Sequence, residues 1–591
     1  MAFLLVITLN SFHAAQSQSA DPRDLQNGYS IYDNGYIDQP YVVVLKDGRW
    51  LCVFTTGAGI ESTPGQHIVS TISSDQGKTW SPPVSIEPNT GPSASWATPY
   101  LTKFGRVYVF YDYNGDNIDS LNGKPISHNS EMGWYCYKYS DDNGFSWSQR
   151  YRLPLPKAPV DFRNDFKGQV QLFWGIDKPK QYGNNMIFAF TRLGKYVQSD
   201  GEGWFYKSGN IYTEKNSGKL HWELLPDGDK GLRNPAYGSV QEEHNTVPLN
   251  NGDLYCMYRT TQGFPAHSYS RDGGHTWTLP LPATYEPKGK QGLKNPRACP
   301  RVFKTHDGKY LLWYHNRGEK SYQGRNPVWI SGGIEKNGFL HWSQPEILLY
   351  DIDTTILGMS YPDLIEQDGR FWFTETQKTK ARVHPVDLNL LKAMWRQSTA
   401  HKLITNGLIY QKKCIKANTL ASVRQLPNLK DRGFAIDLWL QLKDLKPGQV
   451  VLDSRDHLGK GICLLTTLQR TLKLELNDGR NTDGWDTDPG LLTAKKMHHV
   501  VFIVDGLSNI ITVVVDGILC DGGVGRLHGW GRFSEKLGDV NGTKSWRLAP
   551  NMRGSIKDFK VYNRYLTTSE AISNFHAGFK GNDFSGKSSC E

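Results

Sequence analysis

The motif S-x-D-x-G-x-x-W occurs three times in the first half of the chain and restricts its fold more than any other feature. The copies are Ser73–Trp80, Ser140–Trp147 and Ser270–Trp277. Asp and Gly favour a tight turn, the Ser and Asp oxygens can accept hydrogen bonds from turn amides, and Trp can anchor a hairpin. Degenerate copies end at Trp222 and Trp342, so five tryptophans recur 55 to 75 residues apart. This spacing is typical of the four-stranded blades of a β-propeller.

A second repeat, out of phase with the first, consists of strand–turn–strand segments. Five short ones contain YVVVLKDG, YLTKFGRV, NTVPLNNG, RVFKTHDG and DLIEQDGR, and a longer one, VQLFWGIDKPKQYGNNMIFAFTR, lies between the second and the third. Short strands joined by tight turns agree with 59 Gly, 30 Pro and 12% aromatic residues in a chain of 591. Six hairpins predict six blades, and therefore an all-β, six-bladed β-propeller over residues 25–398.

The three full motifs resemble the Asp boxes of the sialidase (neuraminidase) superfamily, and the resemblance covers roughly residues 30–395. It implies a sialidase-like propeller. Asp boxes also occur in other propellers, so by themselves they mark a fold rather than a function.

The pattern changes near residue 400, where VHPVDLNLLKAMWRQ predicts a short helix closing the propeller and closely spaced strands follow. The segments HHVVFIVDGLSNIITVVVDG and GSIKDFKVYNRYLTTSEAISNFHAG resemble laminin-G/concanavalin-like jelly rolls. We therefore expect a β-sandwich over residues 405–580, which either binds glycan or supports the propeller, with support favoured. Its loop Asn477–Gly490 is either a structural calcium site or a solvated turn. No other cofactor is expected.

The N-terminal segment and the bulk composition indicate where the protein acts and on what. Residues 1–17 have a short apolar core and then small polar residues, which predicts a cleaved signal and a secreted or periplasmic protein. No later apolar run is long enough to span a membrane. The formal charge of +10 suits an acidic glycan, and without a Lys/Arg stripe nucleic acid is not expected as a partner. The eight scattered cysteines predict buried thiols, with neither a zinc site nor a disulfide framework.

The open ends of the six hairpins should meet at one face of the ring and line an axial pocket. The residues at these ends are mostly polar, aromatic or titratable, which predicts a functional site. Before the first strands lie Asp38, Gln39, Trp96, Asp165–Lys167, Glu243, His244, Arg297 and Tyr361, and after the second strands lie Tyr111–Tyr113, Arg192, Arg259, His315 and Glu375.

The sialidase resemblance becomes specific at four of these positions. In that family a nucleophilic Tyr stands just before a strand, and SYPDLIEQDG places Tyr361 there. The Glu that activates it is matched by Glu243 in QEEHNTVPLNNG. Two arginines are matched by Arg259 in LYCMYRTT and Arg325 in GRNPVWIS.

One position departs from the family. The first Arg of the family faces YIDQPYVVV in this chain, so Asp38 replaces it. Three arginines grip the carboxylate of sialic acid, and a carboxylate in place of one of them would repel it. Ordinary sialidase activity is therefore not expected. The acid/base position of the family falls in GAGIESTPGQHIVS, where Glu61 and His67 are candidates, with Asp38 a third.

These residues predict a retaining glycoside hydrolase. A free Tyr has a pKa of about 10 and needs help to act as a nucleophile. Glu243 could take its proton, while Arg259 and Arg325 favour the phenolate, and Tyr361 would attack the anomeric carbon. The predicted function is exo-acting removal of a terminal acidic or modified sugar from a complex glycan or polysaccharide. The expected substrate contacts are Arg259, Arg325, Arg297, His244, Gln39, Trp96, Arg192, His315 and Glu375.

Two alternatives remain open at this point. A polysaccharide lyase acting on uronates would use Tyr361, His244 or His315 as the base, with Arg259 or Arg297 on the carboxylate. A glycan-binding propeller without turnover is the other. A metal is not expected, because adjacent residues such as Glu242 and Glu243 point to opposite faces of a regular strand.

Overall fold

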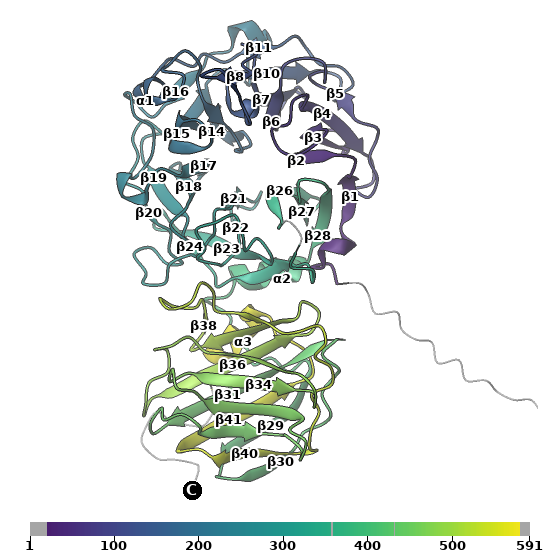
Figure 1. Ribbon diagram of the computed structural model, residues 1–591, viewed down its shortest axis with the longest axis vertical. Helices are drawn as coiled ribbons and strands as arrows, with labels where there is room; N and C mark the ends of the chain where they lie inside the picture. Colours follow the sequence, from purple (N-terminus) through teal and green to yellow (C-terminus); the bar gives the residue numbers. More distant parts are fainter. Residues whose placement is uncertain (1–20, 356–357, 431, 579–591) are drawn as a thin grey trace, which may run out of the picture.

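The computed structural model describes residues 21–355, 358–430 and 432–578 as a ring of β-sheets placed against a β-sandwich (Figure 1). The predicted signal segment, residues 1–17, lies outside the described residues. The all-β class and the order of propeller and sandwich are confirmed. The helices are short and peripheral: α1 (Pro159–Arg163), α2 (Leu388–Trp395) and α3 (Thr568–Ala577).

Strand pairing groups the ring into antiparallel sheets of four or five strands. In chain order they contain β2 (Tyr36–Val44), β3 (Trp50–Gly57), β4 (His67–Ser73) and β5 (Val84–Ser85); β6 (Ala94–Leu101), β7 (Val107–Tyr113), β10 (Trp134–Ser140) and β11 (Tyr151–Arg152); β12 (Phe173–Trp174), β13 (Lys180–Tyr182), β14 (Asn185–Lys195), β15 (Ser199–Ser208) and β16 (Glu223–Leu225); β17 (Gln241–Pro248), β18 (Leu254–Thr260), β19 (Ala266–Ser270) and β20 (Leu281–Pro282); β21 (Arg301–Lys304), β22 (Tyr310–Tyr314), β23 (Val328–Lys336), β24 (Phe339–Trp342) and β25 (Glu346–Leu349); and β26 (Ser360–Gln367), β27 (Arg370–Thr376), β28 (Ala381–Val386) and β1 (Tyr29–Tyr32). A separate hairpin is formed by β8 (Ser120–Leu121) and β9 (Lys124–Pro125).

The ring is closed by strand pairing between its two ends. N-terminal β1 pairs antiparallel with β28, with Tyr29 opposite Val383. The prediction that the helix after residue 386 closes the propeller is therefore wrong. Helix α2 packs on the outside of the sheet that contains β22, where the Trp395 indole N–H donates to the Tyr310 carbonyl at 2.9 Å.

The repeated S-x-D-x-G-x-x-W segments form the turns that their residues predict. In the first copy the Gly77 amide donates to Ser73 Oγ at 2.8 Å, and the Thr79 amide donates to Asp75 Oδ1 at 2.9 Å. The Trp80 indole donates back to the Gly77 carbonyl at 3.1 Å. The two later copies repeat the Ser and Asp contacts, so each motif ties a turn to the outer part of its sheet.

The C-terminal domain is a sandwich of two antiparallel sheets. One contains β29 (Leu408–Ile415), β31 (Gly433–Leu442), β36 (Met497–Asp505), β37 (Ile510–Val515), β38 (Ile518–Leu519), β39 (Gly531–Arg532) and β41 (Gly554–Tyr562); the other contains β30 (Thr419–Ser422), β32 (Val450–Asp453), β33 (Gly461–Thr466), β34 (Leu472–Asn477), β35 (Thr482–Asp486) and β40 (Ser545–Asn551). Alternating residues such as Leu438, Phe502 and Leu474 fill the core between the sheets. Residues 477–490, for which either a structural calcium site or a solvated turn was expected, contain the turn of the β34–β35 hairpin and strand β35.

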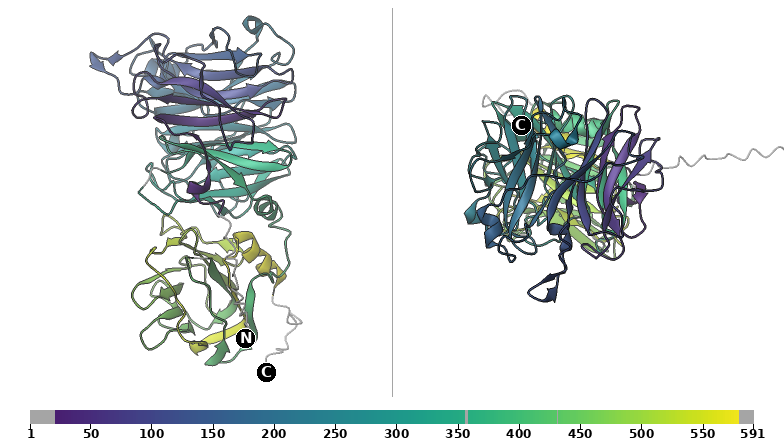
Figure 2. Two further views of the ribbon diagram at one scale, coloured as in Figure 1. Left: turned by 90° about the vertical axis from the view of Figure 1, so that its right-hand side faces the viewer. Right: turned by 90° about the horizontal axis from the view of Figure 1, so that it is seen from above.

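The sandwich lies against the rim of the ring, beside β23, β24 and α2 (Figures 1 and 2). Glu346 on β25 accepts hydrogen bonds from the Thr568 and Ser569 amides at 2.9 and 2.7 Å, at the N-terminus of α3. Arg23 forms an ion pair with Asp505 of the sandwich at 2.7 Å. Because buried polar contacts and shared apolar core join the two domains, they support one another.

Six described cysteines are buried free thiols, as expected. Cys414 is disulfide-bonded, so the prediction that the cysteines are thiols is wrong at this position. Over residues 21–355, 358–430 and 432–578, no helix is both long and apolar enough to cross a membrane. Within the same residues no group of three or more His, Cys, Asp or Glu side chains is arranged to hold a metal ion.

Candidate active site

The first strands of four sheets share a β-bulge that turns one residue toward the axis of the ring. The residues are Gln39, Trp96, Glu243 and Tyr361, with φ of 52°, 62°, 57° and 46°, and the strand register shifts at each. A positive φ is uncommon for residues other than Gly, and bulges re-aim side chains. Trp96 and Tyr361 belong to one buried cluster, although they come from different sheets. The fold therefore brings these predicted residues together at one end of the strands.

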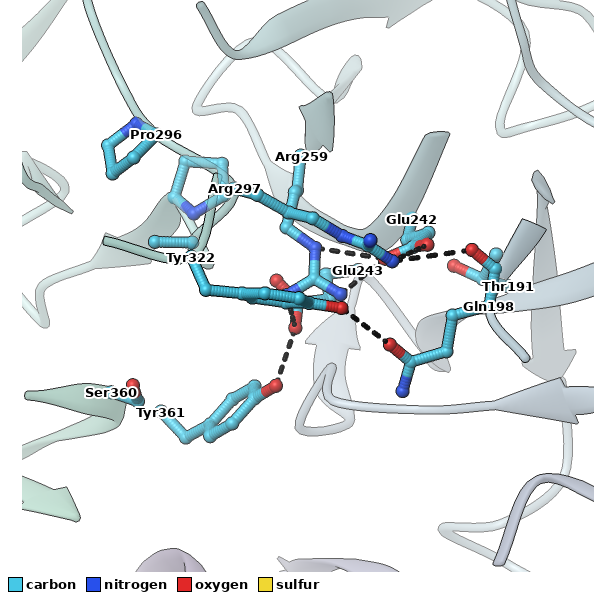
Figure 3. A network of polar contacts seen from close by, with 12 residues as sticks. Thr191, Gln198, Glu242, Glu243, Arg259, Pro296, Arg297, Tyr322, Ser360 and Tyr361 are labelled. Atoms are coloured by element: carbon cyan, nitrogen blue, oxygen red, sulfur yellow. Dashed lines mark hydrogen bonds and ion pairs between the residues drawn. The ribbon is translucent and has the colours of Figure 1, made fainter. Parts of the chain in front are cut away.

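Tyr361 and Glu243 form the centre of the site (Figure 3). The Tyr361 hydroxyl donates to Glu243 Oε1 at 2.8 Å. The same oxygen lies 2.7 Å from Arg259 Nη1. All three side chains are buried. The candidate nucleophile Tyr361 and the cation Arg259 thus both contact one oxygen of the candidate base Glu243, from segments that are up to 118 residues apart in the chain.

Glu242 lies in the same cluster, which the alternation of a regular strand did not predict. Arg259 Nε donates to Glu242 Oε2 at 3.0 Å, and Arg297 Nη2 donates to Glu242 Oε1 at 2.9 Å. The bulge at Glu243 breaks the alternation, so both carboxylates reach one guanidinium. The expectation that Glu242 and Glu243 point to opposite faces is wrong. The Arg259 guanidinium therefore binds two protein carboxylates, Glu242 and Glu243, and its positive charge acts on Tyr361.

Burial shifts the pKa of both central groups upward. Burial raises the pKa of Tyr361 well above its usual value, and the neighbouring Glu243 charge adds to the shift while Arg259 opposes it. Burial also raises the pKa of Glu243, and Arg259 again opposes the shift. A phenol is thus the resting form of Tyr361, and Glu243 is a stronger base than an exposed carboxylate.

Arg325 and Arg297 are the arginines of the site that remain partly exposed. Arg325 Nη1 donates to Ser360 Oγ and Nη2 to the Arg297 carbonyl, both at 2.7 Å. The Arg297 guanidinium lies 4.5 Å from the centre of the Tyr322 ring, and the Arg325 guanidinium lies 5.5 Å from it. Among the described residues, Nε of each arginine has no hydrogen-bond partner. These Nε atoms are buried, but each guanidinium group as a whole is partly exposed and positively charged, so it can attract an anionic ligand.

Lys378 is a site residue that the sequence analysis missed. Its ammonium lies 2.6 Å from Asp38 Oδ2 and 3.2 Å from Glu61 Oε1. It also lies 4.5 Å from the centre of the Tyr361 ring. Lys378 follows the second strand of the sixth hairpin, three residues beyond Glu375. Its place at the end of a strand was the feature of the sequence that could have identified it as a site residue.

Asp38 and Glu61 are the two other carboxyls whose charges act on Tyr361, and both contact Lys378. Burial, with the Glu61 charge in support and Lys378 in opposition, raises the pKa of Asp38 to about 6. Lys378 is the main cause that holds the pKa of Glu61 below its usual value against burial. The Asp38 side chain is 0% exposed and the Glu61 side chain 32%. Asp38 is thus the group that can hold a proton, and Glu61 the one that a ligand can reach.

Gln39 and Trp96 form the wall of the site. The Trp96 indole N–H donates to the Ser130 carbonyl at 3.1 Å, and its ring packs edge-on against Trp174 at 5.0 Å. Gln39 Nε2 lies 3.5 Å from the Gly175 carbonyl, and its Oε1 has no partner among the described residues. Trp96 is buried and packs rather than offering a free face for a sugar.

His244 and His315 are not placed to contact a substrate or to act as bases. The ring nitrogens of His244 lie 2.9 Å from Thr191 Oγ1 and 3.1 Å from the Leu232 carbonyl. Burial lowers the pKa of His244 to about 3, and burial with the nearby Arg325 lowers the pKa of His315 to about 3. His315 Nδ1 contacts the Pro327 carbonyl at 3.4 Å. No pattern in the sequence separates such packed histidines from functional ones.

Three other candidates have partners elsewhere. Arg192 forms a buried ion pair with Asp161 of α1. Glu375 lies 3.5 Å from Arg382 and 3.7 Å from His384 on the outer strand β28. His67 begins β4, the third strand of its sheet, and its Nδ1 contacts the Gly65 carbonyl at 3.1 Å. Their contacts indicate structural roles, and Glu61 takes the place in the loop for which His67 was also considered.

Comparison with known proteins places two regions of the chain in described families. Residues 194–372 match the BNR repeat-like domain, and residues 416–571 match the concanavalin A-like lectin/glucanases superfamily. The chain therefore contains a BNR repeat-like region and a concanavalin A-like region. It is also similar to a sialidase of Clostridium perfringens, with 23% identity over 274 residues, which cover 44% of this chain and 63% of that protein.

Solved structures with similar folds include further sialidases. Hadza microbial sialidase Hz136 has 16% identity and a TM-score of 0.43, with 61% of this chain and 68% of the other covered. Trypanosoma rangeli sialidase has 13% identity and a TM-score of 0.40, with 92% and 94% covered. A protein of unknown function from Dyadobacter fermentans has 15% identity and a TM-score of 0.44, with 61% and 98% covered.

Proposed function

We propose that the protein is a sialidase-like, retaining glycoside hydrolase that uses Tyr361 as its nucleophile. The observation that carries the proposal is the buried hydrogen bond of 2.8 Å from the Tyr361 hydroxyl to Glu243, whose acceptor oxygen is also bound by Arg259. The sequence similarity to a Clostridium perfringens sialidase supports the same reaction class. Export, which residues 1–17 predict, would bring the enzyme to glycans outside the cell.

In the first step the Tyr361 oxygen attacks the anomeric carbon while its proton passes to Glu243. The bond from that carbon to the leaving oxygen breaks, and the departing alcohol takes up a proton from an acid. Positive charge next to the phenol lowers the cost of this step, because Arg259 and the Lys378 ammonium both favour a developing phenolate. A sugar–tyrosine bond results. Water then attacks the same carbon and releases Tyr361, with net retention.

We assign the leaving-group proton to the carboxyl pair Asp38 and Glu61, which Lys378 bridges. Asp38, with a pKa of about 6, stores the proton close to neutral pH. The proton moves from Asp38 to Glu61, which Lys378 holds ionised, and then to the leaving oxygen, because the Glu61 side chain reaches solvent while Asp38 is covered.

The proposed substrate is a glycan that ends in an acidic sugar. Arg325 and Arg297 are two partly exposed cations beside Tyr322, which suits a carboxylate or sulfate on the terminal sugar. Asp38 in place of a family arginine argues for a different orientation of that anion from the one in a sialidase. The anion would lie toward Arg325 rather than toward Asp38.

The test is product analysis by mass spectrometry in ¹⁸O-labelled water. Wild type and Tyr361→Phe are incubated with sialosides, pectins and algal polyuronates, and with neutral glycans as the matched control. Products that gain one labelled water per cut, and that are absent with Tyr361→Phe, support hydrolysis through Tyr361. Products without added water and with a new double bond would replace this proposal with elimination, and binding without any product would leave a glycan-binding propeller.

A further inference from the structure

The loop that joins β22 to β23, residues 315–327, is held at both of its ends by the C-terminal sandwich. This loop carries Tyr322 and Arg325 into the candidate active site. Its partners in the sandwich lie between β38 and the end of β39. The C-terminal domain thus contacts a segment of the site directly, in addition to the apolar contact that it makes with the rim of the ring.

The first end of the loop is fixed by main-chain and indole hydrogen bonds. The Gly318 amide donates to the Leu527 carbonyl at 2.7 Å. The Trp530 indole N–H lies 3.4 Å from the Asn316 carbonyl, and the Trp530 ring packs 6.4 Å from that of Trp329 on β23. Trp530 is buried at the domain boundary. The start of the loop is therefore part of the boundary and not a free surface segment.

The second end is fixed by Arg532 of β39. Arg532 Nη2 donates to Asn326 Oδ1 at 2.9 Å. The Asn326 amide group in turn donates to the Asp351 carbonyl at 2.8 Å and its oxygen accepts from the Asp351 amide at 3.1 Å. Asn326 is the immediate neighbour of Arg325. A shift of Asn326 would therefore move the guanidinium that binds Ser360 Oγ and the Arg297 carbonyl.

Between these two ends the loop is tied to the site itself. The Ser321 carbonyl accepts from the Arg297 amide at 2.9 Å, and the Tyr322 hydroxyl lies 3.3 Å from Gln198 Oε1. The loop has few apolar anchors of its own, since Tyr322 is 50% exposed. The loop therefore depends on its two ends for its position, and residues 527–532 of the sandwich hold both ends.

We propose that the C-terminal sandwich positions Arg325 and Tyr322 for substrate binding, and that Arg532 is a positioning residue. The effect on turnover rests on the proposed function, whereas the effect on the loop does not. The sandwich would then be required for affinity at the propeller site even if it binds no glycan itself. Small displacements of substrate-binding groups weaken binding strongly, because the contacts depend on exact geometry.

Arg532→Ala and the milder Trp530→Phe test the proposal in the full-length chain. Glu346→Gln is the matched control, because it disturbs the boundary at α3 without touching the loop. Hydrogen–deuterium exchange of peptides that cover residues 316–326 is read against peptides from the Asp-box turns. We expect faster exchange in the loop with Arg532→Ala, a smaller increase with Trp530→Phe, and wild-type exchange with Glu346→Gln.

Kinetics with the hydrolysed glycan supply the second readout. We expect Arg532→Ala to raise KM about tenfold while kcat changes little, in line with coupling of about 1–2 kcal/mol through a contact network. Unchanged exchange in the loop with Arg532→Ala would overturn the inference, and so would an equal rise in KM with Glu346→Gln. Absence of turnover by wild type would refute the proposed function, while the exchange result would still decide the positioning role.

Discussion

Replacing Arg259 by Met tests the charge arrangement at the centre of the site. Met fills much of the volume of the Arg side chain but brings no charge. Glu243 would lose the cation that lies 2.7 Å from it, whereas Glu242 would keep Arg297 at 2.9 Å. The variant therefore leaves one buried carboxylate without a partner cation, next to a second carboxylate.

The magnitude follows from the contact distance and the burial. At 2.7 Å and an effective dielectric constant of 20, the attraction between Arg259 and Glu243 is about 6 kcal/mol before desolvation is counted. Removing one member of a buried ion pair typically costs about 3–5 kcal/mol. The folded-state pKa of Glu243, already above its usual value, should rise further.

This rise determines how the loss of stability depends on pH. A carboxyl whose pKa is higher in the folded than in the unfolded chain binds its proton on folding, so stability increases as pH falls toward the unfolded pKa. The loss of folding stability caused by Arg259→Met should therefore be greatest at pH 8. It should shrink by about 1.4 kcal/mol per pH unit over the range in which Glu243 is protonated in the folded variant but ionised in the folded wild type.

The assay is thermal unfolding of wild type, Arg259→Met, Glu243→Gln and the double variant at pH 5 to 8. Because the double variant contains no unpartnered carboxylate at position 243, it should unfold at a higher temperature than Arg259→Met at pH 8. A double variant that is less stable than both single variants, or a deficit that does not change with pH, would refute the reasoning.

Two further predictions concern the acid and the turns. Because Asp38 holds a proton up to a pKa of about 6, kcat/KM should fall as pH rises above 6. Glu61→Gln should remove most activity on substrates with poor leaving groups. An Asp38→Asn variant whose kcat/KM depends on pH as in wild type would contradict this. Ser73→Ala removes the buried acceptor of the Gly77 amide and should cost about 1–3 kcal/mol, seen as a lower Tm, while Ser85→Ala at an exposed position should have no effect.

The ring and the centre of the site were predictable because both depend on local patterns that repeat. Each hairpin is specified by a turn between two apolar runs, and equivalent hairpins place equivalent residues at the same end. Tyr361 and Glu243, 118 residues apart, could therefore be placed in one pocket, and the sialidase resemblance then singled them out as a pair. Closure of the ring by β1 was missed, because Tyr29–Tyr32 has no turn partner nearby in the sequence.

The residues that were misplaced depend on contacts between distant segments. A bulge is a single extra residue, and nothing in QEEHN marks it, so Glu242 was assigned to the wrong face. His244 is a packed residue because Thr191 and Leu232 occupy its nitrogens, and both come from other segments of the chain. Arg532 contacts the site loop across more than 200 residues, which only the docking of the two domains determines.

Asp38 is predicted to take the place of a family arginine, and Lys378 changes what that replacement would mean. Two carboxyls, Asp38 and Glu61, face this single ammonium, so the local charge is negative whenever both are ionised, and Asp38 holds its proton up to a pKa of about 6. An anionic sugar that binds at Arg325, whose charge also acts on Glu61 and Lys378, adds negative charge and should raise the pKa of the pair further. The enzyme would then take up a proton when the substrate binds, so the substrate itself would bring the acid into its protonated form. Calorimetry of a substrate with Tyr361→Phe at pH 7, in buffers of different ionisation enthalpy, should show this uptake, and Asp38→Asn should abolish it. Binding without proton uptake would mean that the anion lies away from Lys378, and the acid would then have to be sought outside this pair.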